Sequence, residues 1–334
     1  MSSSTRALVT GATGCLGEQL VQSLVETGVS VRALARQSSR TESLGALGVS
    51  VERGSLTDEA DLQRAVKGMD VVYHLGGLVI DDPSDTSDAL WQQIREVNVE
   101  GTEKLARQAA AAGVRRFVFA SSVRIFGFGN QILWGEDGPR TPSDLYSRGK
   151  ALAEEALARV AQETGLEVVN IRPRFIYGNG DRYILPRIVQ QIQRGVAPLP
   201  RGGNALCDTV YVKDCVQGFM LAAEQPVAGR SYNIVSGECL TFREIFEEVA
   251  RAMGRTVRIV PLPGPVATGI ATAVEFGSRA LHRAPALSRA QLMWYMNDHS
   301  FSIARARSEL GYQPRYRLPD ALREIDLQQF AAAA

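Results

Sequence analysis

A glycine-rich turn between an apolar strand and a helical pattern most constrains the fold of this 334-residue chain. The apolar run 7–10 leads into Gly11, Gly14 and Gly17, and apolar residues then recur with helical spacing. Glycines let the backbone turn sharply and approach a pyrophosphate, which the N-terminal end of the following helix attracts. The first gap is one residue wider than in the usual dinucleotide fingerprint, so the strand–turn–helix context carries the inference. We predict a nucleotide-binding unit here.

Short β-rich segments alternate with helical patterns after this turn. The candidate strands cover residues 7–10, 29–35, 49–52, 70–77, 116–120 and 166–171, and the two longest helical patterns cover 88–112 and 143–164. Such alternation is typical of a parallel sheet covered by helices on both faces. We therefore predict an α/β fold with a doubly wound parallel sheet and a smaller C-terminal lobe.

Composition excludes several classes of function. A formal net charge of +1 provides no long-range field for nucleic acid or an anionic membrane. No signal-peptide pattern is present, and the longest apolar region, 263–273, is too short and too rich in glycine and proline to span a bilayer, although it fits an apolar surface element. We predict no nucleic-acid partner and no transmembrane segment.

The cysteines and histidines predict reduced thiols and no metal site. Cys15, Cys207, Cys215 and Cys239 form no pair two residues apart and no cluster with histidine, which favours a cytoplasmic protein. The three histidines are scattered along the chain. His74, inside a candidate strand, is interpreted as a packed residue rather than a ligand or base.

The end of the second candidate strand indicates the choice of cofactor. A site for NAD places an Asp or Glu there to bind the adenosine ribose. Here Ala35 stands near that place, with Arg36 next and Arg40 close behind. A missing carboxylate and available guanidinium groups favour a 2′-phosphate, so we predict NADP(H) rather than NAD(H).

Tyr146 and Lys150 are the candidate catalytic pair. They are four residues apart, so they lie on one face of a helix, and Pro142 with Asp144 as a possible cap places Tyr146 in its first turn. A nearby ammonium favours the phenolate of tyrosine. At the end of strand 116–120, a hydroxyl of Ser121 or Ser122 can donate to a substrate oxygen beside the tyrosine.

In this order the motifs resemble an extended short-chain dehydrogenase/reductase of the NAD-dependent epimerase/dehydratase superfamily. The matching residues are the glycine turn, Asn98-Val99-x-Gly101-Thr102, Ser121-Ser122, Tyr146-x-x-x-Lys150, Arg172-Pro173 leading to Tyr177-Gly178-Asn179-Gly180-Asp181, Val210-Tyr211-Val212-Lys213-Asp214, Tyr232-Asn233-Ile234 and Leu310-Gly311-Tyr312-x-Pro314. The resemblance implies a Rossmann-type cofactor domain at 1–175, with 208–235 returning to it. A substrate lobe would consist of 176–207 and 236–330.

The same resemblance implies roles for single residues. Tyr146 would exchange a proton with the substrate oxygen, Ser122 (rather than Ser121) would hydrogen-bond that oxygen, and Lys150 would bind the nicotinamide ribose and lower the pKa of the tyrosine. The implied cofactor-binding residues are Gly11, Thr13, Gly14, Cys15, Leu16, Gly17, Arg36, Leu75, Gly76, Asn98, Tyr146, Lys150 and Pro173.

Departures from the family pattern narrow the function. Sugar-nucleotide dehydratases carry a Thr-Asp-Glu run where this chain has Ser122-Val123-Arg124, so no acid is available for elimination. Many nucleotide-sugar enzymes have an arginine just before the Val-Tyr-Val segment, and residues 206–209 contain none. The stretch 184–211 more closely resembles the 3β-hydroxysteroid dehydrogenase branch. Trp294, Tyr295 and Met296 are interpreted as core, and Arg174 has no assigned role.

The leading hypothesis is an NADP(H)-dependent ketoreductase or hydroxy dehydrogenase acting on a small apolar ketone or alcohol. The alternatives are a nucleotide-sugar epimerase that uses the same Ser, Tyr and Lys, and a non-catalytic regulator that senses the cofactor. By analogy with related dimers, the helices at 88–112 and 143–164 predict a homodimer. The residues name neither the substrate nor the direction of hydride transfer.

Overall fold

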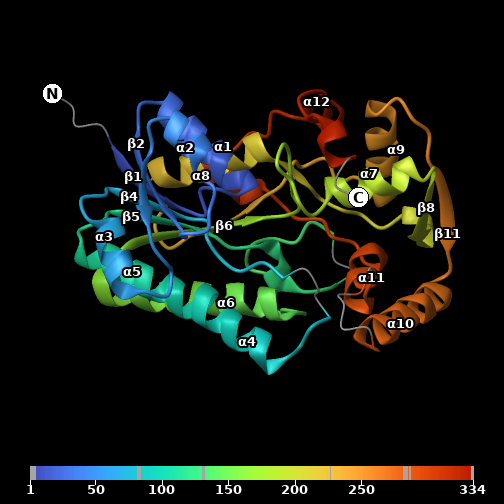
Figure 1. Cartoon of the computed structure of the whole chain (residues 1–334), viewed down its shortest axis with the longest axis horizontal. Helices are drawn as coiled ribbons and strands as arrows, with labels where there is room; N and C mark the ends of the chain where they lie inside the picture. Colours follow the sequence, from blue (N-terminus) through green and yellow to red (C-terminus); the bar gives the residue numbers. More distant parts are fainter. Residues whose placement is uncertain are drawn as a thin grey trace.

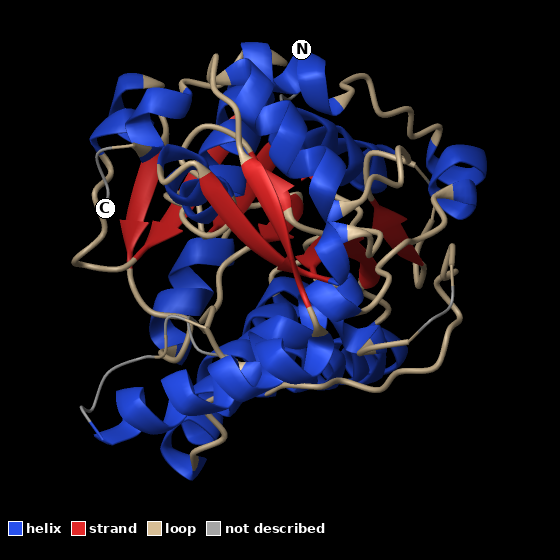
Figure 2. Cartoon of the chain, turned by 90° about the vertical axis from the view of Figure 1, so that its right-hand side faces the viewer, coloured by secondary structure: helices blue, strands red, loops and turns tan. Residues whose placement is uncertain are grey.

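The computed structural model describes residues 5–80, 84–129, 132–225, 227–280, 285 and 287–331. Residues 1–4, 81–83, 130–131, 226, 281–284 and 286, which the predicted domains include, lie outside the described residues. A seven-stranded sheet with strand order β10-β6-β5-β4-β1-β2-β3 forms the centre, and all of its neighbouring strands are parallel. Helices cover both faces (Figure 1, Figure 2). The predicted doubly wound parallel sheet is confirmed.

The two faces of this sheet pack on different helices. Its strands are β1 (Arg6–Thr10), β2 (Ser30–Ala35), β3 (Ser50–Arg53), β4 (Val71–His74), β5 (Arg116–Ala120), β6 (Glu167–Pro173) and β10 (Ser231–Ile234). Successive side chains of a strand point to opposite faces. Leu8 therefore shares a buried cluster with α3 (Glu59–Val66), α5 (Gly101–Ala111) and α6 (Leu145–Thr164). Its neighbour Val9 packs on the other side, in the cluster that contains residues of α1 (Cys15–Glu26), α2 (Glu42–Ala46) and α8 (Val212–Glu224).

The strand order reverses between β1 and β4, and ligands bind at the carboxyl ends of strands at such a point. Gly11 follows β1 with a φ of 70°. A Cβ on Gly11 would lie 2.7 Å from the backbone nitrogen of Gly76, which follows β4. Glycine at position 11 therefore allows both the left-handed backbone and the close approach of the two strand ends.

The helix predicted over 88–112 is not continuous. It consists of α4 (Asp88–Ile94), a π-helical segment (Arg95–Glu100) and α5. Such π-helical insertions often occur at functional sites. Here the insertion contains Asn98, whose Nδ2 donates to the Leu78 carbonyl at 2.8 Å and whose Oδ1 accepts from the Leu78 N–H at 2.6 Å. The wider turn therefore carries a side chain that fixes the loop after β4.

A second hydrophobic core lies beyond the carboxyl ends of the sheet. It includes Val189, Phe246 and Leu322, all buried. The elements on this side of Figure 1 are α7 (Leu185–Gln193), β8 (Val196–Pro200), α9 (Phe242–Ala252), β11 (Arg258–Leu262), α10 (Gly264–Ala280), α11 (Arg289–Met296) and α12 (Leu318–Arg323). β8 pairs with β11, and β7 (Ile176–Tyr177) pairs with β9 (Val210–Tyr211). Short helical segments cover Val123–Phe126, Arg201–Gly203, Ala306–Leu310 and Leu327–Phe330.

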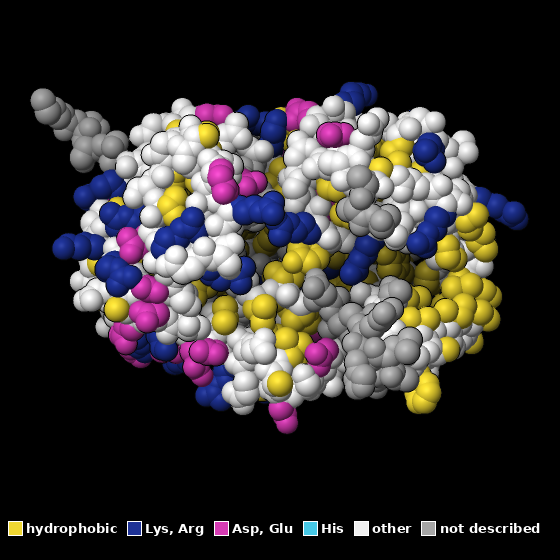
Figure 3. Space-filling model, in the orientation of Figure 1, with side chains coloured by type: hydrophobic (Ala, Val, Ile, Leu, Met, Phe, Trp, Pro, Cys, Tyr) yellow, Lys and Arg dark blue, Asp and Glu magenta, His cyan; other side chains and the backbone are white. Residues whose placement is uncertain are grey.

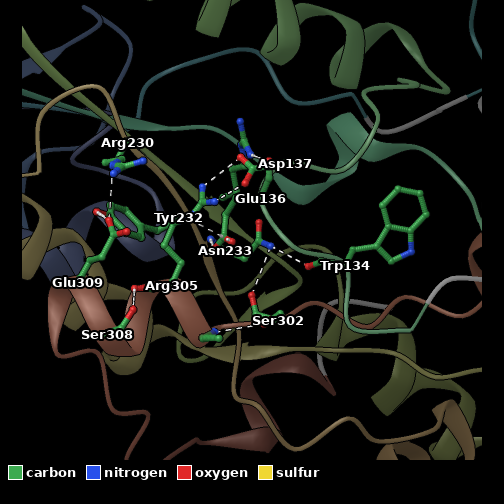
Figure 4. Close-up of polar contacts among 12 residues, drawn as sticks. Trp134, Glu136, Asp137, Arg230, Tyr232, Asn233, Ser302, Arg305, Ser308 and Glu309 are labelled. Carbon is green, nitrogen blue, oxygen red and sulfur yellow. Dashed lines mark hydrogen bonds and ion pairs between the residues drawn. The ribbon is translucent and has the colours of Figure 1, made fainter.

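A polar network ties β10 to the loop that precedes α6 and to the C-terminal segment (Figure 4). Asn233 donates from Nδ2 to the Trp134 carbonyl at 3.0 Å, and its backbone N–H donates to Glu136 Oε1 at 3.1 Å. Arg305 forms ion pairs with Glu136 and Asp137. These contacts anchor the connection between the two strand-end serines and the helix that carries Tyr146.

Candidate active site

A cavity of about 690 Å³ opens at the carboxyl ends of the strands. Figure 3 shows the recess, with Lys and Arg side chains at its edge and apolar side chains within it. The predicted site residues that line the cavity are Gly11, Thr13, Gly14, Cys15, Leu16, Gly17, Arg36, Leu75, Gly76, Ser122, Tyr146, Lys150 and Pro173. Asn98 is the exception, because it contacts the Leu78 backbone instead.

The glycine turn leaves room for a pyrophosphate in front of α1. Gly14 precedes this helix and provides no side-chain cap, so the N–H groups of the first turn face the cavity unpaired by a capping oxygen. A Cβ on Gly14 would meet only the Gly11 carbonyl, at 3.5 Å, whereas a Cβ on Gly17 would lie 2.1 Å from that oxygen. The turn is therefore tight at Gly17 and open at Gly14, which fits a nicotinamide dinucleotide.

The loop after β2 presents Arg36 to the cavity. Arg53 fixes this loop by donating from Nη1 to the carbonyls of Arg36 at 2.8 Å and Ser39 at 2.9 Å. Arg36 is exposed and lines the cavity together with Ser39, whereas Arg40 does not line it. Asp181 is the only acid lining the cavity within the described ranges, and it accepts from backbone N–H groups of residues 183–185.

His74 is a structural residue, as predicted. Its side chain is fully buried, and burial lowers its pKa to about 3, so the ring is neutral. Thr102 Oγ1 donates to the Asn98 carbonyl at 2.7 Å and so accepts from Nε2 of His74 at 2.9 Å. Nδ1 is then an acceptor for Thr10 Oγ1 at 2.7 Å, and Thr10 in turn accepts from Gly76 N–H at 3.0 Å. This chain of hydrogen bonds fixes the strand ends under the cofactor site.

The reactive helix begins where the sequence predicts. Asp144 caps α6, accepting from the backbone N–H of Ser147 at 2.8 Å, so Tyr146 lies in the first turn. One turn later, Lys150 donates from Nζ to the Ala120 carbonyl at 2.6 Å and lies 5.8 Å from the centre of the Tyr146 ring. The ammonium is thereby held at the end of β5, beside the cavity.

Both strand-end serines line the cavity. Ser122 Oγ accepts from the Arg124 backbone N–H at 3.2 Å, which leaves its own hydroxyl hydrogen free to donate to a ligand. Ser121 Oγ is buried and has no hydrogen-bond partner among the described residues. The serine that the family resemblance set aside therefore also lies at the cavity, with a buried and unpaired hydroxyl.

The pKa of Tyr146 departs from the expectation. The resemblance implied that Lys150 lowers it, but burial raises it to about 12, although the Arg124 charge acts in the opposite direction. The ammonium of Lys150 is engaged by the Ala120 carbonyl, and desolvation of the phenolate outweighs the neighbouring charges. At neutral pH Tyr146 is protonated, which is the form that donates a proton to a carbonyl oxygen.

Trp294 is buried and Tyr295 packs against the second core, as predicted, but both residues also line the cavity. They come from α11, in the C-terminal part of the chain, and long-range packing brings them to the same cavity as Tyr146. Two guanidinium groups contact Trp294: the Cζ of Arg124 lies 4.9 Å from its ring centre, and the Cζ of Arg174 lies 4.4 Å from it. Both arginines follow the carboxyl ends of strands, Arg124 after β5 and Arg174 after β6. Site residues are expected at such strand ends, so the sequence could have indicated both.

No group of three or more His, Cys, Asp or Glu side chains that could hold a metal ion occurs in the part of the chain that the structure describes. Over the same residues, no helix combines the length and apolar character that crossing a membrane requires.

Known proteins share both the sequence and the fold. Residues 7–235 match the model of the NAD dependent epimerase/dehydratase family. The chain is 32% identical to a 3-beta-hydroxysteroid dehydrogenase of Mycolicibacterium neoaurum, covering 96% of this chain and 90% of that protein. It is 30% identical to the 4-hydroxy-2-methyl-3-oxo-4-farnesyl-3,4-dihydroquinoline-1-oxide ketoreductase of Stigmatella aurantiaca, covering 93% and 92%. A structure of UDP-glucose 4-epimerase from Thermotoga maritima matches with a TM-score of 0.79 at 21% identity, covering 98% and 99%.

The chain therefore belongs to the NAD-dependent epimerase/dehydratase family. It is an oxidoreductase of the extended short-chain dehydrogenase/reductase type, which works with a nicotinamide cofactor. The resemblance drawn from the motifs is confirmed. The likeness to the UDP-glucose epimerase shows the shared fold alone.

Proposed function

We propose that this protein is an NADP(H)-dependent ketoreductase or hydroxy dehydrogenase whose substrate has an apolar body. The observation that carries this proposal is the apolar wall of the cavity beyond Tyr146, built from Ile184, Ile188, Phe242, Ile245, Phe246, Trp294 and Tyr295. Such a wall favours a hydrocarbon skeleton over a sugar diphosphate. The names of the two relatives also describe apolar molecules, a steroid and a farnesyl-bearing quinoline.

Three residues perform the proton chemistry in this proposal. The nicotinamide, when bound, supplies a hydride to the carbonyl carbon or takes one from the carbinol carbon. Tyr146 donates its phenolic proton to the substrate oxygen in reduction and accepts it in oxidation. Ser122 donates a hydrogen bond to the same oxygen and so stabilises the charge that develops there. Lys150 places a positive charge next to the ribose and the tyrosine.

The proposal is tested by following NADPH and, separately, NADH with the purified protein and a panel of apolar ketones. We expect loss of the reduced-nicotinamide absorbance with at least one ketone, together with formation of the matching alcohol. If no ketone consumes either cofactor but a nucleotide-sugar is interconverted, the epimerase alternative holds instead.

Lys150 predicts how the rate depends on pH. Burial lowers its pKa to about 8, with the Glu154 charge acting in the opposite direction. The ammonium form is therefore present below pH 8 and is lost as the pH rises through that value. We expect kcat/KM for ketone reduction to fall above about pH 8. In Lys150→Arg we expect this fall in kcat/KM to occur at a higher pH. A profile that stays flat to pH 9.5 in the folded protein would contradict this role.

Arg36 is proposed to hold the 2′-phosphate of NADP(H). It lines the cavity at the end of β2, where no acid does so among the described residues. Replacing Arg36 with Ala removes a charge-assisted hydrogen bond, so we expect the Kd for NADPH to rise roughly tenfold or more, with little change for NADH. Arg40→Ala is the matched control, since Arg40 lies in the same loop but does not line the cavity. Equal losses for both cofactors in Arg36→Ala would remove the basis for this preference.

We infer a homodimer through α4, the following π-helical segment, α5 and α6. A groove on this surface is lined by Trp91, Arg95, Val99, Arg148, Leu152, Glu155 and Arg159, and Arg148 stacks on Trp91 with its Cζ 4.1 Å from the ring centre. A charge at Leu152, on the outer side of α6, would stand in this interface. We expect Leu152→Glu to elute as a monomer in size-exclusion chromatography with light scattering, and the unmodified chain as a dimer. A monomeric unmodified chain would exclude this assembly.

We further infer that residues 1–175 and 208–235 form the cofactor domain, and that 176–207 and 236–330 form the substrate lobe. The support is that β10 joins the large sheet beside β6, whereas α7, α9 and α12 share the second core. A cytoplasmic location remains part of the proposal and is tested by cell fractionation.

A further inference from the structure

Arg174 is a buried cation that interacts with the Cys207 thiol but leaves two of its side-chain nitrogens unpaired among the described residues. The side chain is 2% exposed, and its Nε and Nη2 have no hydrogen-bond partner among the described residues. Its aromatic neighbours, Phe175 and Trp294, have ring centres 3.6 Å and 4.4 Å from its Cζ. Burying an unpaired guanidinium is costly, so its presence at a cavity wall points to an anionic ligand.

The groups nearest Arg174 do not supply that anion. Burial raises the pKa of Cys207 to about 12, so the thiol is neutral. The Asp208 charge acts on Arg174, but no ion pair joins the two within the described residues, and Asp208 Oδ2 accepts from the Phe301 N–H at 2.6 Å. Burial lowers the pKa of Arg174 to about 10, which leaves it charged at neutral pH.

Arg124 brings a second guanidinium to the same place. Its Nη2 donates to Asp144 Oδ2 at 2.6 Å, but its Nε is buried and has no partner among the described residues. Its Cζ lies 4.9 Å from the ring centre of Trp294 and 5.0 Å from that of Tyr146. Arg124 therefore contacts both Trp294, on which Arg174 also packs, and the proton donor Tyr146.

We propose that Arg174 and Arg124 form a carboxylate-binding subsite, so that the substrate is an apolar oxo acid or hydroxy acid whose carboxylate lies a few bonds from the reacting carbon. Guanidinium–carboxylate hydrogen bonds are short, about 2.8 Å, and Arg124 is adjacent to Tyr146, which limits that separation. The apolar wall beyond Trp294 receives the hydrocarbon part. This inference rests on the proposed reductase function and names its substrate class.

The test compares 3-hydroxydecanoate with its methyl ester as substrates for oxidation by NADP⁺. In either case the carbinol C–H yields a hydride to the cofactor and the hydroxyl proton passes to the phenolate form of Tyr146, so the two substrates differ in charge and in one methyl group. We expect the kcat/KM ratio of acid to ester to exceed about 30 in the unmodified protein, and Arg174→Met to reduce this ratio by about 30-fold or more. Arg174→Lys keeps the charge but loses the planar fork, so we expect an intermediate ratio.

The control variant is Arg115→Met, which removes one positive charge outside the cavity. Arg115 immediately precedes β5, at the amino ends of the strands and so opposite the cavity, and its side chain is 57% exposed. We expect it to leave the acid-to-ester ratio unchanged. A thermal melt separates binding from folding: Arg174→Met without ligand should melt at the same temperature as the unmodified protein or higher, because the buried cation lacks a partner. A lower melting temperature would assign Arg174 a structural role.

Other outcomes overturn the subsite or the function separately. Equal rates for acid and ester, or an unchanged ratio in Arg174→Met, would exclude the carboxylate subsite and leave the reductase function standing. If neither compound is oxidised and no ketone is reduced, the reductase proposal fails, and calorimetric binding of 3-hydroxydecanoate to the unmodified protein and Arg174→Met then decides the subsite. If Arg174→Met instead weakens binding of UDP-glucose, the anion is a phosphate and the carboxylate assignment is wrong.

Discussion

Tyr146→Phe should lose about 10²- to 10⁴-fold in kcat for ketone reduction, the range that general acid catalysis contributes. Phenylalanine fills the same space in the first turn of α6 but has no proton to donate. The carbonyl oxygen must then take its proton from water, while the hydrogen bond from Ser122 and the cavity wall remain. We expect steady-state NADPH oxidation to show the loss in kcat.

Two observations separate this effect from a loss of binding or folding. The Kd of NADPH, followed by fluorescence, should change little, because the glycine turn and Arg36 are untouched. The urea midpoint of unfolding should also change by no more than it does for a substitution of an exposed residue, since Asp144 still caps the helix. If Tyr146→Phe kept more than about a tenth of the rate, another group would have to supply the proton.

Glu154→Gln should lower the free energy of unfolding by about 3–5 kcal/mol, because it breaks a buried ion pair and leaves one charge behind. Glu154 and Arg172 are each 1% exposed, and they form two hydrogen bonds, of 2.8 Å and 2.6 Å. Arg140 adds a third contact to the same carboxylate, at 3.0 Å. The loss should appear as a lower urea midpoint at pH 7.

Matched variants show whether the buried charge is the cause. Glu26→Gln removes an exposed carboxylate from α1 and should change stability by less than about 0.5 kcal/mol. Replacing Glu154 and Arg172 together with Leu and Met should recover much of the loss, since no uncompensated charge remains. A double variant as unstable as Glu154→Gln would indicate that packing, not charge, dominates. The negative charge of Glu154 also raises the pKa of Lys150. In Glu154→Gln the fall in kcat/KM with rising pH should therefore occur at a lower pH.

Local patterns in the sequence predicted the elements that carry the cofactor site. The glycine turn, the short strands and the cap at Asp144 each depend on residues a few positions apart, and a reader of the sequence sees them directly. The structure places Tyr146 and Lys150 one helical turn apart at the end of β5 for the same reason. The π-helical segment at Asn98 was not foreseen, and the Asn98 side chain within it hydrogen-bonds the distant Leu78, a contact that no local pattern records.

The substrate end of the cavity depends on contacts that no local spacing records. Arg124, Arg174 and Trp294 lie on three separate parts of the chain and meet only after the C-terminal elements pack on the sheet. The direction of the Tyr146 pKa also escaped the sequence, because it depends on how deeply the phenol is buried. Motifs therefore predicted the class of reaction, while the proposal for the substrate needed the tertiary structure.

The most direct measurement follows deuterium from NADPH carrying deuterium at both C4 positions of the nicotinamide into an apolar ketone, in parallel with a reaction of UDP-glucose with oxidised NADP⁺ or NAD⁺. A net reductase, as proposed here, transfers one deuterium to the carbinol carbon of the alcohol, visible by mass spectrometry, in an amount equal to the NADPH consumed. UDP-glucose would be unchanged. Conversion of UDP-glucose to its epimer with no net reduction of the oxidised cofactor, and no deuterated alcohol from any ketone, would contradict the account.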